Sequence, residues 1–338
     1  MTPTRAAEIL ERIRSARIGI VGDFCLDAYW QIDTGSTELS VETGKPTHAV
    51  RSQRYNPGGA GNVAANCRAI GACSVRAFGV VGADLFGREL AALIARRGID
   101  ASGLIVQDAA WDTPVYAKPY LGSEEQERVD FGRWNVLSPE AEASLIRVVR
   151  EALPELDALI VNQQLDRGFA SATVVRALNE MARDARETTF ILDSRTMSGT
   201  FRGMICKLNV AEACRLAGPP GADPAGLRPE VISDWARTIA GRTGMPVFVT
   251  RGADGILVFD GERDATLPAV PLTGPIDTVG AGDTTVAAIA ASLAARASLC
   301  EAAEMGNLAA AVTVKKLRET GTATGEEIMG LSRLRRDA

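Results

Sequence analysis

The sequence predicts an α/β protein built on a mainly parallel sheet with helices on both faces. Short runs of β-branched residues alternate with amphipathic helical patterns along most of the 338 residues, and this alternation is typical of such a sheet. No internal repeat or low-complexity linker interrupts the pattern, so we expect a single domain over residues 1–338. The composition agrees, because 46% hydrophobic and 23% charged residues are ordinary for a globular protein.

The expected elements follow one another regularly. The first 17 residues predict an amphipathic, charged helix, and residues 17–22 the first buried strand. Further strands are expected at 75–81, 103–106, 157–161, 189–193, 205–209, 247–250 and 255–260. Further helices are expected at 62–70, 84–97, 139–153, 169–186, 229–243, 283–295 and 301–317. Gly71 and Gly98 directly follow two of these helices, as glycines that end helices commonly do.

Two segments, 28–54 and 111–134, break this alternation. They alternate polar with aromatic or β-branched residues, a pattern that predicts strands exposed on one face. We expect the two segments to pair into a small sheet, a lid over a site. The alternative is that they form two separate surface hairpins.

Charge and hydropathy exclude several kinds of partner. The net charge is −5 and the isoelectric point about 5.3, so the chain lacks the basic footprint of a nucleic-acid-binding protein. A short basic run at 333–336 is interpreted as a solvated tail. No apolar run approaches the roughly 18 residues of a membrane span. Since the N-terminus has no apolar leader pattern either, the expectation is a cytoplasmic protein.

The single histidine, His48, narrows the possible chemistry. Zinc sites with two or more histidine ligands are excluded, and a catalytic triad would have to use this residue, which lies in a polar stretch rich in threonine. The six cysteines show no CxxC pair or zinc-finger spacing, and most stand in apolar surroundings. We therefore expect buried, free thiols.

The most informative motif is Asp277-Thr-Val-Gly-Ala-Gly-Asp283, directly before a long apolar helix. Its glycines let backbone N–H groups converge at a helix N-terminus, which is a ready anion site. An aspartate at position 283 can accept a proton from a hydroxyl group that attacks a phosphoryl group, while the amides stabilise the developing charge. The alternative is that Asp283 only caps the helix.

Two more motifs follow expected strands. Asn209 and Glu212 stand one helical turn apart at a strand end, where they can orient magnesium-bound water near phosphates. A helix-capping arrangement is the alternative. Residues 250–255 (TRGADG) contain two glycines three positions apart between two strands. This motif is weak by itself, because a strand–turn–strand connection needs glycine in any case.

Near the N-terminus, residues 57–62 (PGGAGN) place glycines before a helix, which permits close approach of a polar ligand. Asp23 and Asp27, at the end of the first strand, are acceptors suited to sugar hydroxyls, with surface ion pairs as the alternative reading. Two common nucleotide motifs are missing. The sequence contains no GxxxxGK[ST], which excludes a P-loop enzyme, and the first strand runs into GDFCLD rather than GxGxxG.

Together these motifs resemble the ribokinase-like (PfkB) carbohydrate kinases over essentially the whole chain. One signature covers residues 58–66 and the other residues 277–290, in the family's order, with NxxE and TxGxxG between them. The resemblance implies a three-layer α/β/α sandwich with a mainly parallel central sheet and a small β-sheet lid. It also implies an ATP-dependent transfer of phosphate to a hydroxyl group of a sugar or sugar phosphate, with Mg²⁺.

The resemblance assigns roles to individual positions. Asp283 corresponds to the catalytic base, and the anion hole consists of Gly280, Ala281 and Gly282. The positions assigned to sugar are Asp23, Asp27, Gly58, Gly59, Asn62, Lys118 and Gln164. Those assigned to ATP are Asn209, Glu212, Thr250, Arg251, Gly252, Gly255 and Asn307, with Glu212 holding Mg²⁺ through water. Asp277 and the Val279 carbonyl mark where K⁺ would bind.

Within the family, the heptose 7-phosphate kinases are the most similar type, through GDFCLDAYW, the PGGAGNVAAN run and residues 128–131. The chain departs from that type at residues 162–165 (NQQL) and 193–195 (DSR), and no nucleotidyltransferase unit is expected in these 338 residues. Lys118, Arg128 and Arg195 are candidates to meet a sugar phosphate, or else lid and surface charges.

Two other functions stay open. A nucleoside kinase of the same fold would want aromatic side chains to stack on a base, and only 5% of the residues are aromatic. A sugar-sensing protein without catalysis would not need the intact Asp283 and its glycines. A homodimer joined through the lid is expected by resemblance, because exposed strand edges favour pairing.

Overall fold

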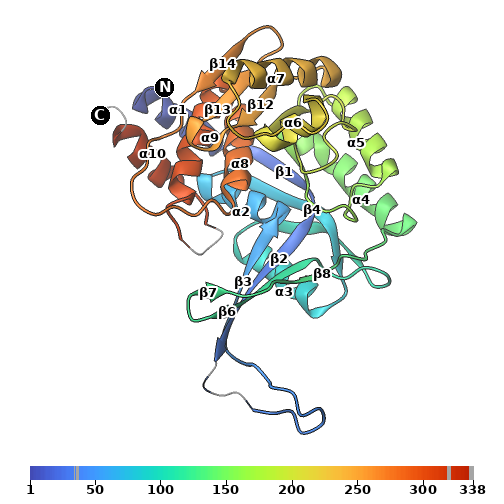
Figure 1. The fold of residues 1–338 in the computed structure, drawn as a ribbon. Helices are drawn as coiled ribbons and strands as arrows, with labels where there is room; N and C mark the ends of the chain where they lie inside the picture. The colour runs from blue at the N-terminus through green and yellow to red at the C-terminus, as the bar shows by residue number, and fades with distance from the viewer. Residues whose placement is uncertain (34, 36–37, 318–320, 335–338) are drawn as a thin grey trace.

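A nine-stranded sheet forms the centre of the molecule (Figure 1). The computed structural model describes all residues except 34, 36–37, 318–320 and 335–338, so part of the predicted basic tail at 333–336 lies outside the described residues. In spatial order the strands are β14 (Asp264–Leu267), β13 (Ile256–Phe259), β12 (Val247–Thr250), β11 (Ile205–Asn209), β10 (Thr189–Ser194), β9 (Ala158–Gln163), β1 (Arg17–Gly22), β4 (Ser74–Gly82) and β5 (Asp100–Gln107). The strands are parallel from β12 to β5, and the pairs β12–β13 and β13–β14 are antiparallel, so that β13 alone among these nine strands is reversed.

Helices cover both faces of this sheet, as the alternating pattern predicts (Figure 1). One face carries α1 (Pro3–Ile13), α2 (Ala60–Ile70), α3 (Leu85–Arg96), α8 (Ala281–Ala294), α9 (Leu299–Thr313) and α10 (Gly325–Leu334). The other carries α4 (Pro139–Ala152), α5 (Ala172–Asp184), α6 (Val210–Ala217) and α7 (Pro229–Thr243). Two short 3₁₀ turns, η1 (Leu153–Glu155) and η2 (Gly252–Asp254), complete the layers. The predicted three-layer α/β/α arrangement is confirmed.

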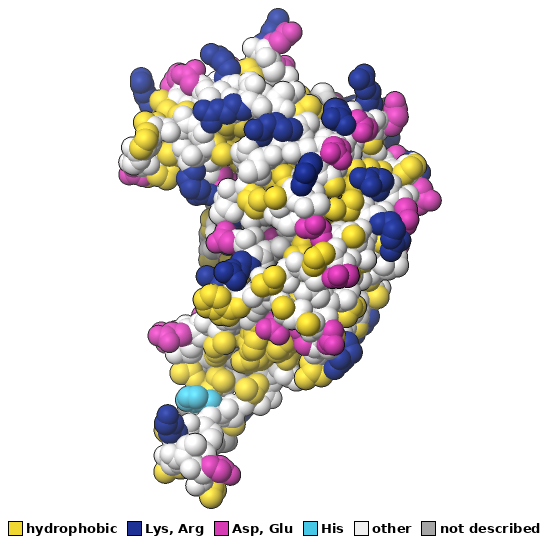
Figure 2. Space-filling view, turned by 90° about the vertical axis from the view of Figure 1, so that its right-hand side faces the viewer, with side chains coloured by type: hydrophobic (Ala, Val, Ile, Leu, Met, Phe, Trp, Pro, Cys, Tyr) yellow, Lys and Arg dark blue, Asp and Glu magenta, His cyan; other side chains and the backbone are white. Residues whose placement is uncertain are grey.

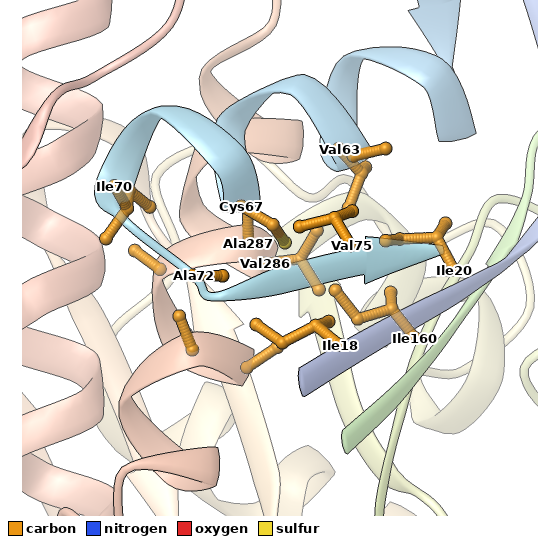
Figure 3. Packing of buried hydrophobic residues seen from close by; sticks show 14 of the residues in the cluster. Ile18, Ile20, Val63, Cys67, Ile70, Ala72, Val75, Ile160, Val286 and Ala287 are labelled. Carbon is orange, nitrogen blue, oxygen red and sulfur yellow. The ribbon is translucent and has the colours of Figure 1, made fainter. Parts of the chain in front are cut away.

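The strands are apolar on both faces because both faces are covered. Ile160 packs into the cluster under α2 and α8, whereas its neighbours Leu159 and Val161 belong to the cluster on the opposite face. Figure 3 shows Val63 and Cys67 of α2 directed at the strands, with Val286 of α8 beside them. Burying one such side chain stabilises the fold by about 1.5–3 kcal/mol. The β-branched runs that predict the strands therefore also form part of the hydrophobic core.

A second, five-stranded sheet lies beside the first. It consists of β2 (Phe24–Asp33), β3 (Ala49–Gly59), β6 (Val115–Leu121), β7 (Glu124–Glu125) and β8 (Val129–Phe131). The strands come from the two segments that break the α/β alternation. Because β2 of the first segment pairs in parallel with β6 of the second, the reading of two separate hairpins is wrong. The arm between β2 and β3 projects away from the body and carries the exposed His48, cyan in Figure 2.

The sequence missed three elements. Helix α6 starts directly after β11, so that Asn209 both ends the strand and caps the helix, and only eight residues remain for a helical pattern. Strand β14 has four partly exposed residues at a sheet edge, and α10 has ten residues near the C-terminus. The helix expected at 301–317 ends at Thr313. Short elements with little burial leave a weak hydrophobic periodicity.

All six cysteines are free thiols; Cys25, Cys67, Cys206 and Cys214 are buried, whereas Cys73 and Cys300 are exposed. Across the described part of the chain, every helix is too short or too polar to cross a lipid bilayer.

Candidate active site

A cavity of about 290 Å³ lies at the carboxyl ends of the central strands, where α/β sheets bind ligands. The smaller sheet forms one wall and the N-terminus of α8 another. Eight lining residues are among those assigned from the sequence: Asp27, Gly59, Gln164, Asn209, Glu212, Gly280, Gly282 and Asp283. Arg195, a candidate from the sequence to meet a sugar phosphate, also lines the cavity, and four more lining residues have no role assigned from the sequence: Cys25, Tyr116, Asp193 and Lys207. The cavity thus joins residues that are up to 258 positions apart in the sequence, from Cys25 to Asp283.

Asp283 stands in the first turn of α8. The N-cap of this helix is Gly280, in the left-handed region at φ 78°, so the reading of Asp283 as the N-cap is wrong. Asn62 Nδ2 donates to Asp283 Oδ2 at 2.8 Å, and Oδ1 has no hydrogen-bond partner within the described residues. Burial raises the pKa of Asp283 to about 7; the nearby Asp193 adds to this effect, while the Asn62 bond and Lys207 oppose it.

The first N–H groups of α8 are only partly engaged. Ala281 donates its N–H to the Thr278 carbonyl at 3.2 Å, so the predicted place of this amide in an anion hole stays a prediction. In the described residues the N–H groups of Gly282 and Asp283 have no backbone or capping partner. Unpaired N–H groups at a helix N-terminus attract negative charge. An anion in the cavity would therefore meet two donors beside Asp283.

Asp27 faces the cavity from β2, and its environment depends on Gly58 and Lys118. A Cβ atom on Gly58 would lie 2.9 Å from Asp27 Oδ2, so only glycine leaves the carboxylate its present position. Lys118 Nζ lies 3.0 Å from Asp27 Oδ1. Burial lowers the pKa of Lys118, but Asp27 outweighs it and the net shift is upward. Lys118 is therefore a partner of Asp27, not part of the cavity lining.

Asp23 does not face the cavity, and its assignment as a sugar contact is corrected. Its two oxygens accept backbone N–H groups from Gln164 at 2.7 Å, Leu165 at 2.8 Å and Phe169 at 3.0 Å. Burial raises the pKa of Asp23 to about 6, although these three bonds oppose the shift. The residue holds the loop that brings Gln164 to the cavity.

Asn62 also contributes indirectly. It is buried and lies outside the cavity lining; its amide orients Asp283, and Asn66 Nδ2 in turn bonds to its side-chain and main-chain oxygens. Its assignment as a sugar contact is therefore corrected to a partner of Asp283.

Asn209 and Glu212 form a capping box. Asn209 Oδ1 accepts the Glu212 N–H and Glu212 Oε2 accepts the Asn209 N–H, each at 2.8 Å. The capping interpretation is thus confirmed, yet both residues also line the cavity. Glu212 Oε1 has no partner in the described part of the chain. Burial raises the pKa of Glu212, and Lys207 opposes this shift.

The residues assigned to ATP beyond this pair lie next to the cavity rather than in it. Thr250 is the register partner of Asn209 on the neighbouring strand, and the turn η2 that follows carries Gly252 and ends at Gly255. Arg251 lies 3.8 Å from Asp254. Asn307 Nδ2 donates to the carbonyls of Leu267 and Pro268 at 2.9 and 3.2 Å, so this amide holds the segment after β14.

The proposed cation ligands sit just before α8. Asp277 Oδ1 accepts the N–H of Val279 at 3.0 Å, which folds this turn back on itself. Among the described residues, no three His, Cys, Asp or Glu side chains are grouped so that they could hold a metal ion. Glu212 still offers one carboxylate oxygen, and Mg²⁺ is commonly bound by one or two carboxylates together with substrate phosphates. The residues present fit that mode.

The pfkB family carbohydrate kinase model matches residues 25–325. The chain belongs to this family. As a pfkB carbohydrate kinase it is a phosphotransferase that acts on sugars. The match spans both signature runs, and it includes every residue that lines the cavity.

Relatives and solved structures agree with this assignment. The bifunctional protein HldE of Caulobacter sp. strain K31 is 33% identical over 333 residues, which cover 96% of this chain and 64% of that protein. HldE of Azorhizobium caulinodans is also 33% identical and covers 91% and 63%. The chain thus spans a little under two thirds of the length of these relatives.

Among solved structures, phosphofructokinase-2 from Escherichia coli in complex with potassium superposes with a TM-score of 0.72 at 21% identity, covering 95% of this chain and 99% of that one. Ribokinase from Arabidopsis thaliana, complexed with ribose and ATP, gives 0.69 at 20% identity and covers 94% and 99%. These likenesses confirm the ribokinase-like fold.

The raised pKa of Asp283 makes a prediction about stability. A carboxyl whose pKa is higher in the folded than in the unfolded chain favours folding at low pH, and this contribution is lost as the pH rises toward about 7. Asp283→Asn removes the titration. Relative to wild type, its free energy of unfolding should rise between pH 5 and pH 8 by at most about 2–3 kcal/mol, since Asp283 is only half-buried and solvent screens part of the effect.

Urea denaturation at both pH values measures the difference. Asp254→Asn, at an exposed carboxyl in η2, is the control and should show no such trend. If the difference in free energy of unfolding between Asp283→Asn and wild type is the same at both pH values, the electrostatic account is wrong.

Proposed function

We propose that residues 1–338 form one kinase domain that transfers the γ-phosphoryl group of ATP to a hydroxyl group of a sugar or sugar phosphate. The observation that carries the proposal is the position of Asp283: a carboxylate with one free oxygen, beside two unpaired N–H groups, at the floor of a cavity. Such a place suits a base that takes a proton next to a group that gains negative charge.

Asp283 is the general base in this proposal. With a pKa near 7, a large fraction of the Asp283 carboxyl is ionised at neutral pH. The carboxylate is also a strong enough base to accept the proton of the attacking hydroxyl group. Asn62 holds Oδ2, so Oδ1 is the oxygen that takes the hydroxyl proton. The N–H groups of Gly282 and Asp283 stabilise the charge on the transferring group, and the positive end of α8 adds to them.

ATP is proposed to bind along the ends of β11 and β12. Asn209 and Glu212 meet its phosphates, and the turn from Thr250 to Gly255 supports the nucleotide. Magnesium, held by Glu212 through water, would neutralise phosphate charge during transfer. Asp277 and the Val279 carbonyl offer oxygens for K⁺, the ion in the related phosphofructokinase-2 complex.

The acceptor is proposed to bind against the smaller sheet. Asp27 accepts its hydroxyl groups, the glycines at 58–59 leave room for close approach, and Gln164 forms part of the opposite wall. With these contacts the acceptor hydroxyl can face Asp283. A nucleoside acceptor is disfavoured, since Tyr116 is the only aromatic side chain among the lining residues. A non-catalytic sugar sensor would keep the half-buried Asp283, with its raised pKa, without using it.

Arg195 favours a sugar phosphate over a neutral sugar. Lys118 is paired with Asp27, and Arg128 makes two bonds to Asp130 at 2.6 and 2.9 Å. The Arg195 guanidinium lines the cavity and makes no ion pair within the described residues. Its charge acts on Cys25 and Tyr116, which belong to the smaller sheet. An anionic group on the acceptor would therefore meet an available arginine.

The substitution Asp283→Asn tests the proposed base. It should lower kcat by about 10²–10⁴-fold, because the hydroxyl proton loses its acceptor, while the affinity for Mg·ATP stays nearly unchanged. The measurement is ADP release with Mg·ATP and potassium over a panel of hexoses, pentoses, sugar phosphates and nucleosides.

In wild type, kcat should rise with pH and level off above about 7, as the carboxyl loses its proton. Most of the activity surviving in Asp283→Asn would overturn this assignment. Wild-type protein that binds no ATP would overturn the kinase proposal as a whole.

Replacing Arg195 tests the acceptor charge. Arg195→Gln should raise KM for a sugar phosphate by about 10–100-fold, the cost of a lost hydrogen bond to a charged group, and leave KM for ATP unchanged. The control is Arg147→Gln, on the exposed face of α4. Equal KM values for phosphorylated and free sugars in wild type would exclude this role.

The smaller sheet also supports a homodimer. Strand β3 is an unpaired edge of that sheet, Val50 on it is 47% exposed, and Val41 on the projecting arm is 97% exposed. Figure 2 shows hydrophobic side chains gathered on the lower part of the molecule, near the arm. Edges of this kind readily pair with a second chain.

Sedimentation equilibrium should give twice the chain mass of 35.7 kDa. Val50→Lys should shift the protein toward monomer, because a charged edge residue opposes pairing. Arg147→Gln serves again as the control. A monomeric wild type at micromolar concentration would contradict the dimer.

A further inference from the structure

Three side chains form a row across the sheet, and two of them, Asp193 and Lys207, line the cavity. Asn162 on β9, Asp193 on β10 and Lys207 on β11 are register partners on adjacent strands. Residues two positions earlier on β9 and β10, Ile160 and Ile191, pack into the core cluster that contains α8. Since side chains alternate along a strand, the row faces α8 as well.

Asp193 links the other two members of the row. Its Oδ1 lies 3.0 Å from Lys207 Nζ, and its Oδ2 accepts from Asn162 Nδ2 at 3.2 Å. Asp193 is 4% exposed and Lys207 is 5% exposed. The Asn162 amide thus positions the Asp193 carboxylate, and this carboxylate holds the Lys207 ammonium group from one side.

The bond to Asp193 uses one of three N–H donors on Lys207. Within the described residues the ammonium makes no other hydrogen bond, although it lines the cavity. A Cβ atom built on Gly282 would lie 3.3 Å from Nζ, so the ammonium lies against the first turn of α8. A buried cation with unused donors is costly unless a ligand meets them.

Charge keeps the ammonium protonated. Burial lowers the pKa of Lys207, but Asp193 and Glu212 outweigh this effect and the net shift is upward. Lys207 therefore suits binding of an anion and not proton transfer at neutral pH.

We propose that Lys207 is a catalytic residue that binds an oxygen of the phosphoryl group during its transfer, beside the N–H groups of α8, and that Asp193 and Asn162 are positioning residues. This inference rests on the proposed kinase function. In the step, the acceptor oxygen forms a bond to the γ-phosphorus and the bond from that phosphorus to the β–γ bridging oxygen breaks. The hydroxyl proton goes to Asp283, and Lys207 keeps its own.

A structural role is the competing explanation, since Lys207 also neutralises Asp193. The double substitution Asp193→Asn with Lys207→Met separates the two. It removes both charges together, so the fold keeps no unpaired buried ion, but the phosphoryl group loses its cation. Asp193→Asn alone keeps the ammonium and loosens its orientation.

The experiment measures kcat with Mg·ATP, Mg·ADP affinity by calorimetry, and the melting temperature, for wild type, both single variants, the double variant and Asp283→Asn. We expect the double variant to melt close to wild type, to bind Mg·ADP within about threefold, and to lose about 10²–10³-fold in kcat. Asp193→Asn should lose less.

The outcomes separate this inference from the proposed function. A double variant whose kcat returns to within about fivefold of wild type overturns the role of Lys207, because only neutralisation of Asp193 was then needed. An inactive double variant beside an active Asp283→Asn supports Lys207 and overturns the proposed base. Wild type that neither binds nor turns over Mg·ATP overturns both.

Discussion

Burial of α8 is the constraint on which the rest of the structure depends. Nine consecutive residues of this helix, 284–292, are buried between the sheet, α2 and α9. A helix that is apolar on all sides can lie only inside the protein. Its N-terminus is thereby held at the carboxyl edge of the sheet. The unpaired N–H groups and Asp283, which are half-buried, therefore face the cavity.

The second constraint is electrostatic. Burial penalises the charged form of Asp283, and the nearby Asp193 and Asp27 raise its pKa further. Two lysines compensate, since Lys118 pairs with Asp27 and Lys207 with Asp193. Within the part of the chain that the structure describes, Asp283 makes no ion pair. Asp283 is therefore the carboxylate least compensated by positive charge, and it is the one proposed to accept a proton. The same lack of compensation lowers the stability of the fold.

The smaller sheet connects fold and specificity. A single residue, Asp23, separates the end of β1 from the start of β2, so the smaller sheet starts at the cavity. Cys25 and Asp27 alternate with residues that face away from it, and Tyr116 reaches the cavity from the neighbouring strand β6. The wall proposed to meet the acceptor is thus built by pairing two segments about 90 residues apart, and neither segment forms it alone.

The sequence by itself determined the α/β class, the glycine turn before α8, Asp283, and the pair Asn209–Glu212, because each is a local pattern with its own chemistry. Tertiary structure decided which polar residues face the ligand. Asp23 accepts backbone N–H groups of the loop that carries Gln164. Lys207, two residues before Asn209, lines the cavity. Partners such as Asp193 and Lys207 are chosen by strand order and register, and these depend on contacts between segments that no local pattern records.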